Sequence, residues 1–189
     1  MSTATVLPNG DGTTTNWQDD SGGTTNLYTR IDEGTASPND TDYVSTSVQN
    51  QNVYFQLGDM PADFGTATGV TIKLRVARTS SKGDFIQFVN CQLMQNDQTT
   101  AICAASTITD STTITTYSYT PSITGATSKT AWDGMRLRVK SGTGTAGSCR
   151  IYSAQVEVTY TAVSGKIQRV TALDGLGGVG IRLVNPGLW

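Results

Sequence analysis

The stretch Cys149-Arg-Ile-Tyr-Ser-Ala-Gln-Val-Glu-Val-Thr-Tyr-Thr161 decides the fold of this 189-residue chain. From Tyr152 onward, apolar and polar residues alternate with the two-residue period of a β-strand that has one buried and one wet face. Residues 70–76 and 135–140 alternate in the same way and carry lysine and arginine at polar positions. One sheet would leave the apolar faces of all three strands exposed. We therefore predict an all-β fold, a two-sheet antiparallel jelly-roll β-sandwich.

Composition supports this class and argues against two kinds of partner. The formal net charge is −2 and the pI is about 4.9, whereas a nucleic-acid-binding surface needs clustered basic residues. No apolar run approaches the length of a membrane span. We expect neither a nucleic-acid nor a membrane partner.

The N-terminus and the cysteines indicate whether the protein is exported and whether it contains disulfides. Residues 1–10 have neither a basic start nor an apolar core, so we expect no secretion signal. The three cysteines, Cys91, Cys103 and Cys149, cannot all pair within one chain. We expect Cys91 at a core-facing strand position and no disulfide among the three, because reduced thiols in a protein that is not exported usually serve as small buried hydrophobes.

The chain divides into three parts. Residues 1–23 are rich in turn formers and are predicted to be a loop-rich segment. Residues 24–162 should form the sandwich, and a β-bulge near Phe88-Val89 would reconcile a change of phase in residues 85–94. Residues 163–189 are apolar and glycine-broken and should form an extended C-terminal arm. Strands are also expected at residues 27–31, 43–48, 53–57, 102–108 and 114–119, the last near an edge or on a wet face because it is rich in threonine and tyrosine.

The sequence contains few residues that could form a catalytic site. The chain has no histidine, which excludes Ser-His and Cys-His pairs and the usual zinc sites. The acidic pairs Asp19-Asp20, Asp32-Glu33 and Asp40/Asp42 lie in turn-rich contexts where carboxylates cap the backbone. The Gly-x-Gly-x-x-Gly match at residues 175–180 has no room for a following helix. We expect no enzyme activity, no cofactor and no metal.

Exposed aromatic residues leave a binding function open, because sandwich domains that bind sugars stack pyranose rings on tryptophan or tyrosine. Trp17, Tyr117 and Tyr119 are the candidate glycan contacts. Trp132 precedes the strand at residues 135–140 by a short turn, and we interpret it as a core residue.

The layout resembles the jelly-roll virion proteins of tailed bacteriophages, such as head decoration or cement proteins, head fibres and tail-fibre modules. The resemblance covers residues 8–162 and has no diagnostic motif or shared catalytic residue. The stretches that carry it are Pro8-Asn-Gly-Asp-Gly-Thr-Thr-Thr-Asn-Trp17, Tyr28-Thr-Arg-Ile-Asp-Glu33, Asp40-Thr-Asp-Tyr-Val44, Gly69-Val-Thr-Ile-Lys-Leu-Arg-Val76, Trp132-Asp-Gly-Met-Arg-Leu-Arg-Val139 and Val156-Glu-Val-Thr-Tyr160.

The resemblance implies a non-enzymatic capsid decoration or cement protein of the virion, assembled in the host cytoplasm. Its partners would be copies of itself, as a homotrimer, and the major capsid protein or another virion protein, reached through the C-terminal arm. The alternative is a carbohydrate-binding or adhesin module of a fibre that recognises a cell-surface glycan. The arm residues expected at the partner interface are Ile167, Val170, Leu173, Leu176, Ile181, Leu183, Val184, Leu188 and Trp189.

Overall fold

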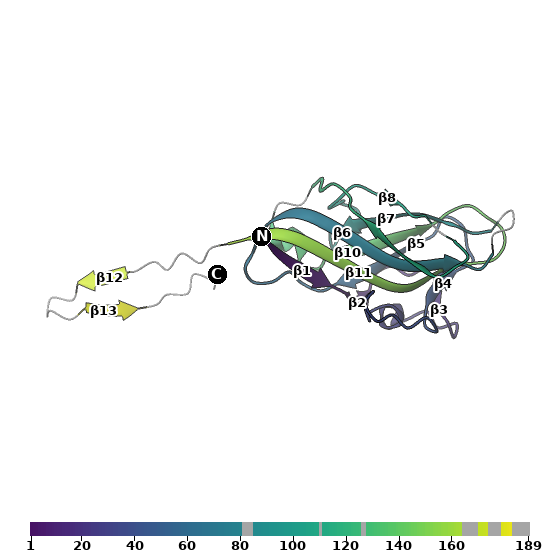
Figure 1. Cartoon of the computed structure of the whole chain (residues 1–189), viewed down its shortest axis with the longest axis horizontal. Helices are drawn as coiled ribbons and strands as arrows, with labels where there is room; N and C mark the ends of the chain where they lie inside the picture. Colours follow the sequence, from purple (N-terminus) through teal and green to yellow (C-terminus); the bar gives the residue numbers. More distant parts are fainter. Residues whose placement is uncertain (81–84, 110, 126–127, 164–169, 174–178, 183–189) are drawn as a thin grey trace.

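Strand β11 (Cys149–Ala162), which contains the stretch that predicts the fold, lies inside a six-stranded antiparallel sheet (Figure 1). The computed structural model describes residues 1–80, 85–109, 111–125, 128–163, 170–173 and 179–182. The neighbours of β11 in this sheet, called sheet A, are β6 (Phe64–Arg78) on one edge and β4 (Val44–Thr46) and β1 (Ser2–Val6) on the other. Beyond them lie β9 (Thr115–Tyr119) and β3 (Gln18–Asp19).

The second sheet, sheet B, has five antiparallel strands, so the all-β, two-sheet prediction is confirmed. Its order is β2 (Pro8–Asp11), β5 (Asn52–Leu57), β10 (Arg136–Ser141), β7 (Phe88–Met94) and β8 (Ser106–Thr107). The chain passes from one sheet to the other between most successive strands, as in a jelly roll. A short helix, α1 (Lys129–Trp132), precedes β10, and no helix among the described residues is long and apolar enough to cross a membrane.

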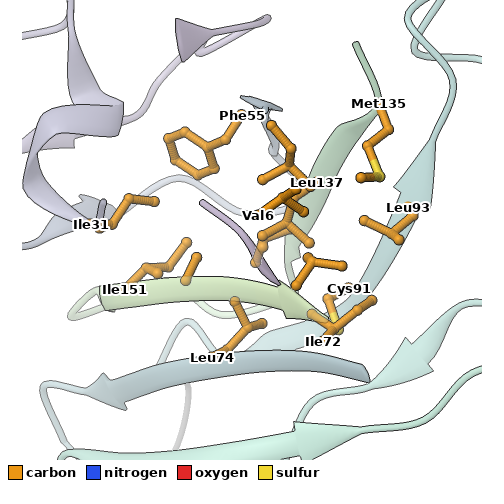
Figure 2. Packing of buried hydrophobic residues seen from close by; sticks show 14 of the residues in the cluster. Val6, Ile31, Phe55, Ile72, Leu74, Cys91, Leu93, Met135, Leu137 and Ile151 are labelled. Carbon is orange, nitrogen blue, oxygen red and sulfur yellow. The ribbon is translucent and has the colours of Figure 1, made fainter. Parts of the chain in front are cut away.

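The core lies between the two sheets because each central strand turns alternate residues inward. Figure 2 shows Ile72, Leu74 and Ile151 of sheet A packed toward side chains of sheet B. Sheet A contributes Val70, Ile72, Leu74, Val76, Ile151, Ala154, Val156 and Val158, and sheet B contributes Val53, Phe55, Leu57, Cys91, Leu93, Leu137 and Val139.

The β-bulge predicted near Phe88-Val89 is present. Lys140 pairs with Asn90 and Ser141 with Phe88, which leaves Val89 as the extra residue of β7. Phe88 is 5% exposed and Val89 is 37% exposed. The bulge therefore returns Cys91 and Leu93 to the core face and leaves Val89 exposed.

Three predicted segments differ in the structure. Residues 27–31 form a 3₁₀-helix, η1 (Leu27–Arg30), because the Asp11 carboxylate accepts hydrogen bonds from the backbone N–H groups of Leu27 and Tyr28, both at 2.9 Å. Residues 1–23 supply β1, β2 and β3 and are therefore part of the sandwich. Residues 102–108 contain only the two-residue strand β8.

The C-terminal region contains a separate two-stranded sheet. Strand β12 (Val170–Leu173) pairs antiparallel with β13 (Val179–Arg182), and Figure 1 shows these two strands outside the sandwich. The side chains of Val170, Leu173 and Ile181 are not described. The other predicted interface residues, Ile167, Leu176, Leu183, Val184, Leu188 and Trp189, lie outside the described residues.

The cysteines should be chemically inert in the folded protein. All three are fully buried, and Cys91 is in the core as predicted. Burial raises the pKa of the Cys91 thiol to about 12 and raises the pKa of Cys103 as well. Because the thiolate is the reactive form, we predict no alkylation of native protein by iodoacetamide at pH 8 and complete alkylation in urea, measured by mass spectrometry. Rapid modification of native Cys91, or a disulfide in non-reduced protein, would contradict this.

Candidate functional site

The outer face of sheet B carries a continuous set of long polar side chains. The strict alternation of β5 and β10 turns these residues away from the core, and all are half-buried. We call this set the polar face. It consists of Asn52, Tyr54 and Gln56 on β5, Arg136, Arg138 and Lys140 on β10, and Asn90 and Gln92 on β7.

Strand register places each cation of β10 between uncharged groups. Arg138 pairs with Tyr54 on one side and with Gln92 on the other. Lys140 lies in the same way between Asn52 and Asn90. Directly opposed residues of an antiparallel pair have Cβ atoms about 5 Å apart, so these side chains form rows across the face.

Hydrogen bonds to amide oxygens hold the two arginines in place. Arg136 donates from Nη1 to Gln56 Oε1 at 2.7 Å and from Nη2 to Asn96 Oδ1 at 2.6 Å. Arg138 donates from Nη2 to Asn90 Oδ1 at 3.2 Å. The Nε atoms of both are buried without a hydrogen-bond partner among the described residues. Both guanidinium groups thus keep donor capacity after their internal contacts are made.

The charge of this face is positive and not neutralised. None of its eight residues is a carboxylate, and the six ion pairs among the described residues involve no lysine or arginine of β10. Burial lowers the pKa of Arg136, but a guanidinium stays charged at neutral pH. Three fixed cations therefore lie along one strand of an acidic protein.

The outer face of sheet A is organised differently. Lys73 forms an ion pair with Glu157, and the Arg75 guanidinium donates two hydrogen bonds to the Asp40 carboxylate. Gln155 Oε1 accepts hydrogen bonds from the backbone N–H and the hydroxyl of Thr35 at 3.1 and 3.2 Å. Residues 35–40 therefore lie over this face, and the charges of Lys73 and Arg75 are already paired.

The turn between β7 and β8 lies across one end of the polar face. Asn96 contacts Arg136, and Gln98 Oε1 accepts the backbone N–H of Thr13 at 3.2 Å. Thr13 adjoins β5 on the far side from β7, since its carbonyl accepts the N–H of Tyr54. To reach Thr13 the turn must pass over β10 and β5. The face is bounded at its Arg136 end.

The glycan contacts predicted from sequence do not gather at this face. Trp17 is 0% exposed and cannot stack on a sugar, which corrects that prediction. Tyr117 and Tyr119 lie on the edge strand β9, as predicted, but they pair with Leu74 and Ile72 and therefore face the core, half-buried. Trp132 is fully buried against Phe64, as expected for a core residue.

Two of the three acidic pairs, Asp19-Asp20 and Asp40/Asp42, have carboxylates that contact the backbone or neighbouring arginines. Asp19 Oδ1 accepts the N–H groups of Ser21 and Gly23 at 2.9 and 2.6 Å, and its Oδ2 accepts from Arg30 at 3.3 Å. Asp40 is paired with Arg75. No group of three or more acidic, cysteine or histidine side chains among the described residues could hold a metal.

Sequence reasoning missed the polar face, although part of the signal was present. The alternation in residues 53–57 and 135–140 already places Tyr54, Gln56, Arg136 and Arg138 on solvent faces. It does not show that β10 lies between β5 and β7, which is what brings these residues together.

Comparison with known proteins adds little beyond the architecture. No family model and no curated protein matches the sequence. Similar solved structures include the C-terminal CBM6 of LamC from Zobellia galactanivorans, with 13% identity and a TM-score of 0.46 over 84% of this chain and 100% of that one.

Two further similar structures come from other organisms. The N-terminal cellulose-binding domain of β-1,4-glucanase C from Cellulomonas fimi has 13% identity and a TM-score of 0.39, over 78% of this chain and 89% of that one. The family 29 carbohydrate-binding module CBM29_1 from Piromyces equi has 11% identity and a TM-score of 0.38, over 84% and 93%. All three are carbohydrate-binding modules and none is a virion protein. At these values the likeness is one of β-sandwich architecture alone.

Asp97 should control the turn that bounds the polar face. Its carboxylate accepts the N–H groups of Thr99 and Thr100 at 2.9 and 2.8 Å and the Thr100 hydroxyl at 2.6 Å. These hydrogen bonds, led by the one from the Thr100 side chain, lower the pKa of Asp97 from 3.8 to about 2. The charged Asp97 carboxylate therefore stabilises the folded turn. This stabilisation is complete above about pH 4 and is lost as the pH falls through about 2.

We therefore predict that NMR titration of the Asp97 carboxyl gives a pKa near 2. In Asp97→Asn the backbone amide protons of Thr99 and Thr100 should exchange with solvent faster, because the neutral asparagine side chain replaces a charged hydrogen-bond acceptor. A normal pKa near 4 would contradict the geometry.

Proposed function

We propose that this chain is a non-enzymatic carbohydrate-binding module and that its polar face binds an acidic polysaccharide. The observation that carries the proposal is the row of three unpaired cations, Arg136, Arg138 and Lys140, flanked by amides and Tyr54. The face holds no carboxylate or histidine that could act as a general acid or base, so its chemistry suits binding rather than catalysis.

The spacing of the cations fits an extended polymer. Residues of one strand that share a face are two positions apart, or about 7 Å. A polysaccharide that runs along β10 would therefore meet a positive charge at regular intervals. Carboxylates on the polymer would pair with the planar guanidinium groups, which match them with two parallel hydrogen bonds.

The residues that flank the cations can contact the hydroxyl groups and the ring of a sugar. The amides of Asn52 and Asn90 combine donors and acceptors, as hydroxyl groups require. Tyr54 offers an amphipathic ring beside Arg138, on which the apolar side of a pyranose could stack. Because Arg136 and Arg138 are held by internal hydrogen bonds, little side-chain freedom would be lost on binding.

We predict that Arg138→Gln weakens binding to a polyuronate at least tenfold, because a hydrogen bond to a charged group is worth about 1.5–3 kcal/mol. Tyr54→Ala should also weaken it. Lys140→Gln should weaken binding as well. Its matched control is Lys73→Gln, which also removes one lysine charge, but from the outer face of sheet A, where Lys73 is already paired with Glu157.

Affinity electrophoresis in gels that contain a polyuronate or a neutral β-glucan would measure these effects. The proposal requires retardation by the polyuronate that Lys73→Gln leaves unchanged and Lys140→Gln reduces. Equal retardation by both polymers, or tighter binding to single-stranded DNA than to the polyuronate, would contradict it.

A second candidate function is that of a virion structural protein, a decoration or cement protein that associates through residues 163–189. One observation supports it. Strands β12 and β13 pair with each other in a sheet of their own, while the described core of the sandwich is built from residues 4–160. A segment with its own backbone pairing outside the sandwich is suited to docking on another subunit or a capsid protein.

Truncation after Val163 tests this second candidate. We predict a folded sandwich with a nearly unchanged melting temperature, because the truncated chain keeps the hydrogen bond from the Val163 N–H to the Asp63 carbonyl at 2.9 Å. It should lose any oligomeric association of the full chain, measured by light scattering and calorimetry. A truncated protein that unfolds or aggregates would show that the tail belongs to the core.

A further inference from the structure

A pocket of about 410 Å³ opens on sheet A, where β6 ends and β11 begins. Its walls include Arg78 and Arg150, and the chain before β9 contributes Thr112 and Ile114. The pocket belongs to a different sheet from the polar face and shares no residue with it. Its volume is within the range that holds a small organic ligand.

The position of Arg150 in this pocket is fixed by aromatic stacking. Its guanidinium carbon lies 4.3 Å from the centre of the Tyr43 ring, and the Tyr43 ring packs against Tyr152 with centroids 5.6 Å apart. Tyr152 is the extra residue of a bulge in β11, since Ile151 pairs with Val76 and Ser153 with Arg75. Tyr152 lines the pocket together with Arg150, and a cation–π contact of this kind leaves the N–H edge of the guanidinium available.

Both arginines keep unused donors. The Nε atoms of Arg78 and Arg150 are buried and have no hydrogen-bond partner among the described residues. Neither arginine takes part in an ion pair with a described residue. A buried donor without a partner is costly, and two guanidinium groups at one pocket attract an anion with acceptor oxygens in a plane.

We infer that this pocket binds a single acidic sugar residue, with its carboxylate on Arg78 and Arg150. The rest of the lining is amphipathic, as a sugar ring requires: Ile114 and Ala77 offer apolar contact, and Thr112 offers a hydroxyl. The inference does not rest on the polar face. It adds a second site, for one residue rather than a polymer segment.

Titration of ¹⁵N-labelled full-length protein with D-glucuronate, D-glucose and inorganic sulfate tests the inference. We expect glucuronate to shift the amide signals of Ala77, Arg78, Thr112 and Arg150, and glucose to shift none of them at equal concentration. Arg150→Gln should weaken glucuronate binding at least tenfold. Arg150→Lys, which keeps the charge without the planar fork, should also weaken it, and a thermal melt would check that both variants fold.

The outcomes separate this site from the polar face. Arg138→Gln should leave glucuronate binding to the pocket unchanged, and Arg150→Gln should leave polyuronate retardation on the polar face unchanged. Sulfate binding as tight as glucuronate would show a simple anion site and overturn the assignment to a sugar. Equal binding of glucose, or no shift of the four amides, would overturn it as well.

Discussion

The structure depends on the register of β10 between β5 and β7. Because side chains alternate strictly along a strand, this register decides together which residues enter the core and which form the polar face. A slip by one residue would bury Arg136, Arg138 and Lys140 and expose Leu137 and Val139. The free-energy cost of three buried charges excludes this alternative. The constraint that forms the core therefore also orders the cations outside it.

The distribution of carboxylates explains how an acidic protein can present a cationic surface. On sheet A, Asp40 and Glu157 neutralise Arg75 and Lys73, and residues 35–40 lie over them. In the η1 region, Asp19 and Asp20 form ion pairs with Arg30. Sheet B receives none of these acids. A net charge of −2 thus describes the whole chain, while ligands would respond to the local charge of one face.

The sequence was sufficient to predict features that depend on local alternation. The paired sheets and the bulge at Val89 follow from the period of the apolar residues, and the edge position of β9 was indicated by its threonine and tyrosine content. Features that depend on contacts distant in sequence were not predictable in this way. Residues 27–30 form a helix because the Asp11 carboxylate accepts the N–H groups of Leu27 and Tyr28, and Trp17 is buried although it lies among turn residues. The polar face likewise requires the strand order, which alternation does not specify.

The most direct test of the account is to map where an oligouronate binds, using backbone amide shifts of the full chain. The account predicts that the largest shifts fall on β5, β10 and β7, at residues such as Tyr54, Gln92 and Arg138, and that they weaken as the salt concentration rises. A neutral oligosaccharide of the same length should give smaller shifts at the same amides. Saturable shifts confined to sheet A or to residues 163–189, with none on β10, would contradict it.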